Sequence, residues 1–201
     1  MTEKRAITQR KGSNLGPIGL KRIISGGQTG ADQGGLSAAK EMGFRTGGRI
    51  PKTFLTEDGP SPWLKEFGLV ETEDYDYRRR TYLNILESDA TLLFSGRVME
   101  RGVSLTFNTA MKLKRPLLRV SLDNLKDTLG WSMELERARN WFDNSWTTMN
   151  VAGPRESRFM GARDLVHNFL LRLLARERLE QALGSRDIVT DFIFSSETKE
   201  V

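Results

Sequence analysis

The stretch Ile24-Ser25-Gly26-Gly27-Gln28-Thr29-Gly30-Ala31-Asp32 decides the fold, because a glycine-rich turn here joins an apolar run to a helical segment. The run Arg22–Ser25 predicts a strand. The pattern over residues 31–42 predicts a helix that stops at Gly43, a residue suited to the left-handed conformation that ends helices. A strand, a glycine turn and a helix in this order are typical of the βαβ units that build parallel sheets.

The same alternation of short apolar runs and helical segments continues along the chain. Near-continuous apolar runs such as Ala-Thr-Leu-Leu-Phe indicate strands that are covered on both faces, as in parallel sheets. The predicted strands are Arg22–Ser25, Phe44–Gly47, Ala90–Ser95, Pro116–Leu122 and Thr147–Ala152. The predicted helices span about 31–42, 75–87, 104–114, 132–144 and 161–182, and the last carries an apolar stripe at helical spacing that we assign to the core.

Charge divides the chain into an arm and a body. Residues 1–22 hold six of the 31 basic and one of the 26 acidic residues, so residues 23–201 hold 25 of each. We expect a flexible basic arm over 1–20, a single ligand-binding domain over 21–183 and a C-terminal extension over 184–201. In that extension, residues 188–194 are interpreted either as an edge strand or as a partner-binding segment. A neutral body makes a nucleic-acid partner an unfavoured hypothesis.

Composition excludes several kinds of site. The absence of cysteine excludes disulfides, thiolate zinc sites and cysteine nucleophiles, and it is compatible with the cytoplasm. The single histidine, His167, excludes histidine-cluster metal sites, and we predict no metal centre. No stretch approaches the roughly 20 apolar residues of a membrane-spanning helix, so no membrane partner is expected.

Three predicted strands end in glycine-containing turns that lead toward helices. These turns contain Gly26–Asp32, Gly96–Thr106 and Gly153–Arg158. In open α/β sheets, ligands bind at the carboxyl ends of the strands, where glycine N–H groups and helix N-termini attract phosphate. The first turn lacks the Gly-Lys-Ser/Thr ending of a P-loop and the G-x-G-x-x-G spacing, and Arg49 stands where a NAD site needs an acid. A phosphorylated, nucleotide-like ligand is therefore favoured over NAD.

Acidic residues offer a second kind of chemistry. The long loop 51–68 carries Lys52, Glu57 and Asp58, and long loops of this kind are often binding segments or lids. Glu57 and Asp58 are candidates for acid–base catalysis or for holding Mg²⁺, with a solvated turn as the plainer alternative. Asp32 lies in the first helical turn, where it complements the helix dipole unless the ligand offers hydroxyl groups. Of Arg78, Arg79 and Arg80, at most one is expected to reach a site.

Six motifs in order carry a resemblance to a known family. They are residues 24–32, Gly-Gly-Arg-Ile-Pro-Lys (47–52), Glu-Asp-Gly-Pro (57–60), Arg-Thr-Tyr-Leu-Asn (80–84), Ser-Asp-Ala-Thr-Leu-Leu-Phe-Ser (88–95) and Asn-Val-Ala-Gly-Pro-Arg-Glu-Ser (150–157). Over about residues 22–175 the chain resembles the putative molybdenum carrier family, the circularly permuted YpsA-like branch of the SLOG superfamily. The resemblance implies a Rossmann-like, doubly wound α/β fold of about five or more mostly parallel strands with helices on both faces.

The resemblance also implies a set of ligand-binding residues. Together with Arg49 and Lys52, we expect the site to contain Gly26, Gly27, Gln28, Thr29, Gly30 and Asp32 in the first loop, Gly102, Ser104 and Thr106 in the second, and Gly153 with Arg155 in the third. The phosphoribohydrolase branch of the superfamily carries a catalytic Glu in the second loop, but residues 101–108 contain no acid. Glu57, Asp58 or Asp32 would have to replace that Glu in any catalysis.

We therefore expect a protein that binds a phosphorylated nucleotide-like molecule, either a signalling nucleotide or a molybdenum-cofactor-like pterin, as a carrier, sensor or sequestering protein. One alternative is a nucleotide N-glycosidase or phosphoribohydrolase-like hydrolase that uses loop carboxylates, with Mg²⁺ as a candidate cofactor. Another is a phage-type sponge for immune signal nucleotides. The sequence leaves open whether any reaction is catalysed. A cytoplasmic homo-oligomer, either a dimer or a tetramer, is expected.

Overall fold

The computed structural model describes residues 19–184, which fold around a six-stranded parallel sheet. The order across the sheet is β5 (Leu69–Glu71), β2 (Arg45–Ile50), β1 (Arg22–Ser25), β8 (Thr148–Ala152), β6 (Ala90–Ser95) and β7 (Leu117–Ser121). Every neighbouring pair is parallel. The chain leaves β1 toward one edge and β6 toward the other, then returns through β8 between them. This order creates a topological switch point at the carboxyl ends of β1, β8 and β6.

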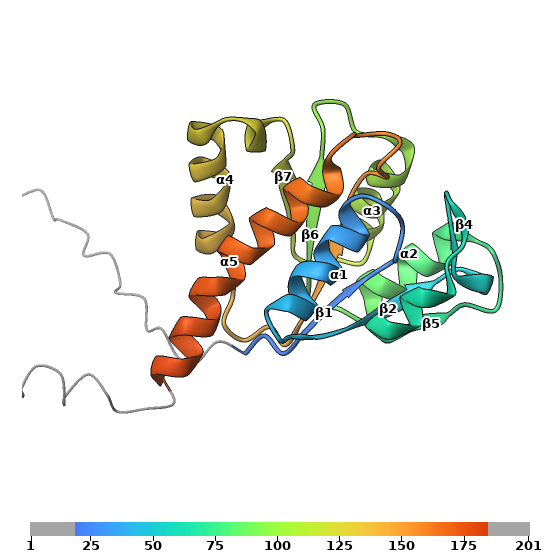
Figure 1. Cartoon of the computed structure of the whole chain (residues 1–201), viewed down its shortest axis with the longest axis horizontal. Helices are drawn as coiled ribbons and strands as arrows, with labels where there is room; N and C mark the ends of the chain where they lie inside the picture. Colours follow the sequence, from blue (N-terminus) through green and yellow to red (C-terminus); the bar gives the residue numbers. More distant parts are fainter. Residues whose placement is uncertain (1–18, 185–201) are drawn as a thin grey trace, which may run out of the picture.

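Five α-helices cover the two faces of the sheet. Figure 1 shows α5 (Ala162–Gly184) crossing in front of α1 (Ala31–Glu41), with α4 (Thr128–Trp141) beside it, and α2 (Tyr77–Leu86) and α3 (Arg101–Lys112) behind the sheet. Leu92 packs in the cluster of α1, α4 and α5, whereas Leu93 packs against Val103 of α3. Neighbouring residues of β6 thus face opposite helical layers, which explains why this strand is buried throughout and mostly apolar. The predicted Rossmann-like α/β fold is confirmed.

Local signals place the helix ends. Helix α1 follows Gly30, whose φ of 74° favours glycine, and its chain reverses at Gly43, with φ 72°. Helix α2 begins after Asp76, whose carboxylate accepts a hydrogen bond from the Arg78 N–H at 2.8 Å. Helix α4 begins in the same way after Asp127, which accepts from the Gly130 N–H.

The structure extends β2 beyond its predicted end at Gly47. The pair Gly47-Gly48 suggested a turn, yet both glycines lie inside the strand because neighbouring groups fill the space that side chains would take. A Cβ on Gly48 would lie 2.1 Å from the Ser25 carbonyl oxygen, and one on Gly47 would lie 2.2 Å from Nη2 of Arg22. Arg49 therefore belongs to the strand and not to a loop after it.

Two further features were not predicted from the sequence. The segment 51–68 folds back as a small antiparallel pair, β3 (Leu55–Thr56) with β4 (Gly59–Pro60), flanked by the short 3₁₀ turns Lys52–Phe54 and Pro62–Phe67. A third such turn, Asn124–Lys126, precedes α4. After the second turn, β5 adds the sixth strand at the edge of the sheet. Only Leu69 of its three residues is buried, so its apolar pattern is short and weak.

The main core lies under α5, whose apolar stripe is buried as predicted. Phe169 contacts Phe94 edge-on, with ring centroids 5.6 Å apart, and Trp131 at 6.0 Å. Leu20, which the sequence analysis assigned to the arm, is buried in this core. Residues 1–18 of the arm and residues 185–201, including the segment 188–194, lie outside the described residues. None of the described helices is long and apolar enough to cross a membrane.

Candidate ligand-binding site at the carboxyl ends of the strands

The first and third glycine loops interlock at the carboxyl ends of β1 and β8. The Ala31 N–H, at the start of α1, donates to the Pro154 carbonyl at 3.1 Å. Gly30 approaches the third loop so closely that a Cβ would lie 2.5 Å from the same carbonyl oxygen. The Glu156 N–H donates to Oγ1 of Thr29 at 3.3 Å. The positions of the two loops are therefore interdependent.

A buried ion pair joins these loops to α2. Asp32 is 2% exposed, and its Oδ2 lies 3.3 Å from Nη1 of Arg80, whose side chain is 11% exposed. Asp32 also accepts hydrogen bonds from the N–H groups of Gln28 and Gly153. Burial raises the pKa of Asp32, and Arg80 together with these hydrogen bonds opposes that rise. Asp32 thus acts as an anchor that touches the first loop, the third loop and α2.

Gly26 makes room for the Arg80 guanidinium. A Cβ at Gly26 would lie 1.8 Å from Nη1 and 2.1 Å from Cζ of Arg80. Of the three consecutive arginines on α2, only Arg80 turns inward. Arg78 and Arg79 are exposed, and Arg79 pairs with Glu73 and Asp74. One of the three thus lies against the glycine loops, and its role toward a ligand stays a prediction.

Glu57, at the tip of the β3–β4 pair, ties that hairpin to the glycine loops. Its carboxylate accepts hydrogen bonds from the hydroxyl of Thr29 and from the hydroxyl and N–H of Ser157. Its own N–H donates to Oε1 of Gln28 at 2.8 Å. Partial burial raises the pKa of Glu57, but the hydrogen bonds from Ser157 and Thr29 outweigh burial and hold that pKa below its ordinary value. At neutral pH Glu57 is an ionised carboxylate in a network of donors.

Several hydrogen-bond donors around the first loop have no acceptor within residues 19–184. The N–H groups of Gln28 and Thr29 are used by Asp32 and by the Gln28 side chain. No such acceptor serves the N–H groups of Gly27 and Gly30. Nε2 of Gln28 and Nε of Arg80 are buried in the described fold without a partner. Buried donors without acceptors cost about 1–3 kcal/mol each, so an oxygen-rich ligand would be stabilising here.

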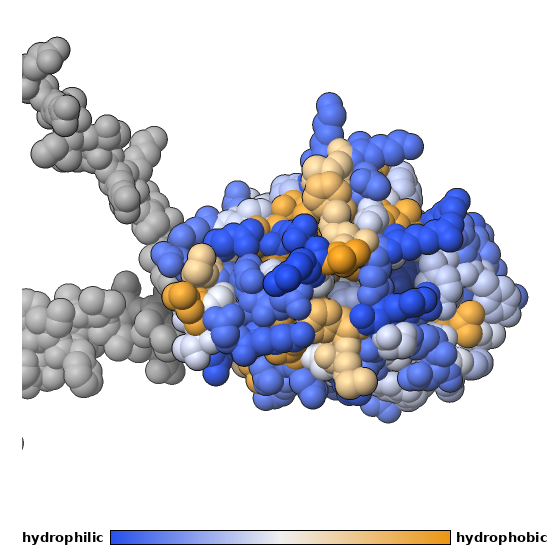
Figure 2. Space-filling view, turned by 90° about the horizontal axis from the view of Figure 1, so that it is seen from above, coloured by the Kyte–Doolittle hydropathy of each residue, from blue (hydrophilic) through white to orange (hydrophobic). Residues whose placement is uncertain are grey.

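Arg155 adds a second guanidinium group to the site, and the Tyr77 ring packs against it. The Arg155 guanidinium carbon lies 5.1 Å from the centroid of the Tyr77 ring, and that of Arg80 lies 5.9 Å from the same ring. Tyr77 thus holds two guanidinium groups near the first and third loops through cation–π contacts. Figure 2, which views the molecule from above, shows hydrophilic and apolar residues interspersed on this side, with no single apolar face.

A hollow of about 210 Å³ adjoins the ends of β6 and β8, and it is lined by Gly96, Arg97, Val98, Glu100, Val103, Asp123, Pro154, Arg158 and Phe159. Burial raises the pKa of Glu100, Arg158 and Arg155 lower it, and the charge of Glu57 adds to the rise. Glu57 and Glu100 therefore interact across the site, with pKa values shifted in opposite directions.

The remaining predicted residues occupy varied positions. Arg49 pairs with Glu87 at 2.8 Å, and Lys52 and Asp58 are exposed. Gly102 begins α3, where a Cβ would meet nothing within 4 Å, and the hydroxyls of Ser104 and Thr106 donate to backbone carbonyls of the same helix region. Gly153 is packed between Ala31 and Phe94. Their roles toward a ligand stay predictions.

Sequence reasoning missed Tyr77, Ser157, Glu100 and Arg158. Glu100 lies one residue before the stretch 101–108, which contains no acid. The predicted start of α3 was three residues too late, so Glu100 was not recognised as the residue directly before this helix. Ser157 lies within a motif already singled out, but only its contact with Glu57, 100 positions away, marks it. In the described part of the chain, no three His, Cys, Asp or Glu side chains group as a metal site would require.

The fold and this site define a Rossmann-like ligand-binding domain with glycine loops at a switch point. The model of the circularly permutated YpsA SLOG family matches residues 23–174, and the chain belongs to that family. It is similar to the crystal structure, at 1.45 Å resolution, of a putative molybdenum carrier protein from Syntrophus aciditrophicus, with 32% sequence identity and a TM-score of 0.66. That similarity covers 78% of this chain and 95% of the other. No curated protein sequence matches this chain.

We expect Arg80→Met to lower the free energy of unfolding by about 3–5 kcal/mol, because it leaves the Asp32 carboxylate buried without its counter-charge. Urea denaturation followed by circular dichroism measures this loss. Arg79→Met is the matched control, since Arg79 makes only solvent-exposed ion pairs, with Glu73 and Asp74, which contribute little to stability. In a double-mutant cycle, Asp32→Asn should cost less in the Arg80→Met background than alone. Equal, small losses for Arg79 and Arg80 would contradict the anchoring role.

We expect Glu57→Gln to destabilise the protein at pH 7 and to have little effect in acid. The lowered pKa of Glu57 means that its contribution is present above its ordinary pKa of 4.5 and is lost as the pH falls through the lower value of the folded state. Unfolding free energies of wild type and variant between pH 3 and 7 measure this difference. Asp58→Asn is the control, because Asp58 is exposed and should show no such convergence.

Proposed function

We propose that this protein binds a phosphorylated, nucleotide-like small molecule at the carboxyl ends of β1, β8 and β6 and holds it without chemical change. The observation that carries the proposal is the set of unused donors around the first loop. The N–H groups of Gly27 and Gly30, Nε2 of Gln28 and Nε of Arg80 find no acceptor in the described chain. Phosphate supplies several acceptor oxygens at once and is the group that such a loop, at a helix N-terminus, binds best.

The positive charge of the site supports the same ligand class. Arg80 is already neutralised by Asp32, but Arg155 contacts the Tyr77 ring and makes no ion pair among residues 19–184. A guanidinium held in this way is preorganised for a bidentate contact with phosphate oxygens. The hollow beside Pro154 and Phe159 offers space next to that phosphate for the rest of the ligand.

Two kinds of ligand share this phosphate chemistry: a nucleotide and the phosphorylated pterin of a molybdenum cofactor. The solved relative is named as a putative molybdenum carrier, which keeps the pterin among the candidates. The donors found here suit the phosphate of either compound. In both cases the proposed role is that of a carrier, sensor or sequestering protein, and heat denaturation should release the ligand intact.

We expect Arg155→Gln to weaken binding of the stabilising ligand by about tenfold or more, because one charge-assisted contact is worth about 1.5–3 kcal/mol. The measurement is thermal stabilisation by nucleoside phosphates, cyclic nucleotides and phosphorylated pterins, followed by calorimetry of the best compound. Native mass spectrometry of freshly purified protein reports retained ligand and the expected dimer or tetramer together.

Arg119→Gln is the matched control, because Arg119 is an exposed residue on the edge strand β7. Gly27→Asp tests the loop itself, although a side chain there would press on Leu69 and Ile50 and strain a φ of 73°. If Arg155→Gln and Arg119→Gln bind every stabilising compound equally well, the proposed position of the phosphate is wrong.

A hydrolase is the second candidate function, and the pair Glu57 and Glu100 is the observation that favours it. A carboxyl group with a raised pKa beside a carboxylate with a lowered pKa is the arrangement that acid–base hydrolysis of a glycosidic bond requires. Glu100 lines the hollow at the end of β6, and the charge of Glu57, on the hairpin, contributes to its raised pKa.

In that case, incubation with nucleoside monophosphates should release free base, as detected by chromatography. Glu100→Gln should reduce the release at least a hundredfold, the usual contribution of general acid–base catalysis, while leaving ligand binding in place. Asp58→Asn is the control and should keep full activity. Intact nucleotides after prolonged incubation with wild-type protein would eliminate this candidate and leave the binding function.

A further inference from the structure

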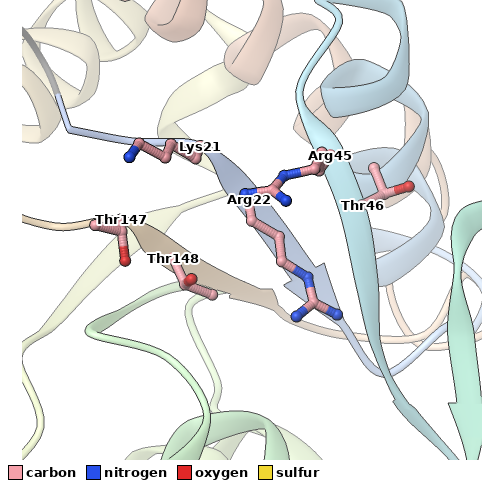
Figure 3. Close-up of a pocket in the computed structure, with 6 residues that line it drawn as sticks. All are labelled: Lys21, Arg22, Arg45, Thr46, Thr147 and Thr148. Carbon is pink, nitrogen blue, oxygen red and sulfur yellow. The ribbon is translucent and has the colours of Figure 1, made fainter.

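A second hollow lies at the opposite edge of the sheet from the glycine loops. About 510 Å³ in volume and open to solvent, it is lined by Lys21, Arg22, Arg45, Thr46, Thr147 and Thr148 at the amino ends of β1, β2 and β8 (Figure 3). Its lining consists of three cations and three hydroxyl groups. Neither the family match nor the glycine loops account for it.

The strand register forces the cations together. Arg22 and Arg45 are direct partners in the parallel ladder between β1 and β2, and Thr148 is the partner of Arg22 on the other side. Like charges at directly opposed positions of a sheet destabilise it. Figure 3 shows the Arg45 side chain reaching across the start of β1, so this cation is held over the other strand and does not diverge from it.

The Arg22 guanidinium packs against Gly47. A Cβ at Gly47 would lie 2.2 Å from Nη2 of Arg22, and the three atoms nearest to that position all belong to the Arg22 guanidinium. Gly47 is absent from the glycines with positive φ, so its backbone conformation does not require glycine. Because glycine has no side chain, this position leaves space for the Arg22 guanidinium.

No carboxylate of residues 19–175 forms an ion pair with these cations. In the described chain, Lys21, Arg22 and Arg45 make no ion pair and no side-chain hydrogen bond. The Asp89 carboxylate, which contacts the threonines of this hollow, is occupied by other hydrogen bonds. Its Oδ2 accepts hydrogen bonds from the N–H groups of Thr147 and Thr148 and from the Thr147 hydroxyl. Those contacts fix the threonine wall of the hollow and leave the positive charge facing solvent.

We infer that the amino edge of the sheet holds a second binding site, independent of the glycine loops, for a small molecule carrying a polyphosphate group. Two guanidinium groups and one ammonium group require an anion of more than one charge, and their N–H donors, together with the hydroxyls of Thr46 and Thr148, suit a group with many acceptor oxygens. Phosphate chains meet both conditions better than a carboxylate, which has two oxygens and one charge. The volume is within the range of small-molecule sites.

Pyrophosphate is the probe, and isothermal titration calorimetry at low ionic strength counts the molecules bound per chain. We expect the double variant Arg22→Gln/Arg45→Gln to weaken the binding of one pyrophosphate molecule by at least about tenfold, because each guanidinium that is removed forms charge-assisted hydrogen bonds with it. Lys112→Gln/Arg119→Gln, which removes the same charge from exposed positions of α3 and β7, should leave it unchanged. Arg155→Gln should also leave it unchanged, which separates this site from the proposed function.

Gly47→Ala gives an independent test that keeps every charge. The nearest atoms that the added methyl group meets are those at the end of the flexible Arg22 side chain, so we expect normal thermal stability together with weaker pyrophosphate binding. The inference is overturned if wild type binds no pyrophosphate, if both double variants lose affinity equally, or if the loss follows Arg155→Gln. It is also overturned if a single-stranded oligonucleotide displaces the probe at lower concentration than ATP does, because the site would then belong to a nucleic-acid backbone.

Discussion

The contact between Asp32 and Arg80 is the interaction on which the rest of the site depends. Removing two charges from water is costly, and a buried pair adds little net stability compared with apolar residues of the same size. What the pair provides is a fixed position of the first loop, the third loop and α2 relative to one another. Asp32 accepts from Gln28 in the first loop and from Gly153 in the third, and Arg80 brings α2 against Gly26. If either partner is lost, three segments lose their common anchor.

This anchor explains why several glycines stand where they do. Gly26 leaves room for the Arg80 guanidinium, and Gly30 allows the third loop to approach the start of α1. The glycines of the first loop therefore serve the packing of the protein as well as any ligand. The donors that this packing leaves unused, above all Nε of Arg80 and Nε2 of Gln28, are what distinguish a binding site from a merely well-packed turn.

The two edges of the sheet present different electrostatics to solvent. At the carboxyl edge, carboxylates and guanidinium groups are interleaved, and Glu57, Glu100, Arg155 and Arg158 influence one another. At the amino edge, three cations face one hollow with no carboxylate lining it. Two of these cations, Lys21 and Arg22, belong to the basic first 22 residues, so part of the excess positive charge lies at this edge of the folded domain. The overall net charge of +5 does not reveal this location.

Several parts of the fold were predictable because their signals are local. Strand β6 was located to the residue, since a continuous buried run has sharp ends, and the helix after the first glycine turn ends within one residue of its predicted position. Strand β5 was missed because two of its three residues are exposed, so its sequence lacks the apolar pattern of a strand. The predicted end of β2 was wrong because a pair of glycines indicates a turn. In the structure, Gly48 adopts its φ of 126° inside the strand beside the Ser25 carbonyl, and Gly47 leaves space for Arg22.

By itself, the sequence determined the α/β class, the parallel order of strands and helices, and the three loops that meet at one edge. These follow from periodicity and from glycine, which act within a few residues. Only the tertiary structure decided which charged groups contact one another. Asp32 and Arg80 are 48 positions apart, Glu57 and Ser157 are 100, and Arg22 meets Arg45 through a ladder register. Such pairings depend on how distant segments pack, and no local pattern records that packing.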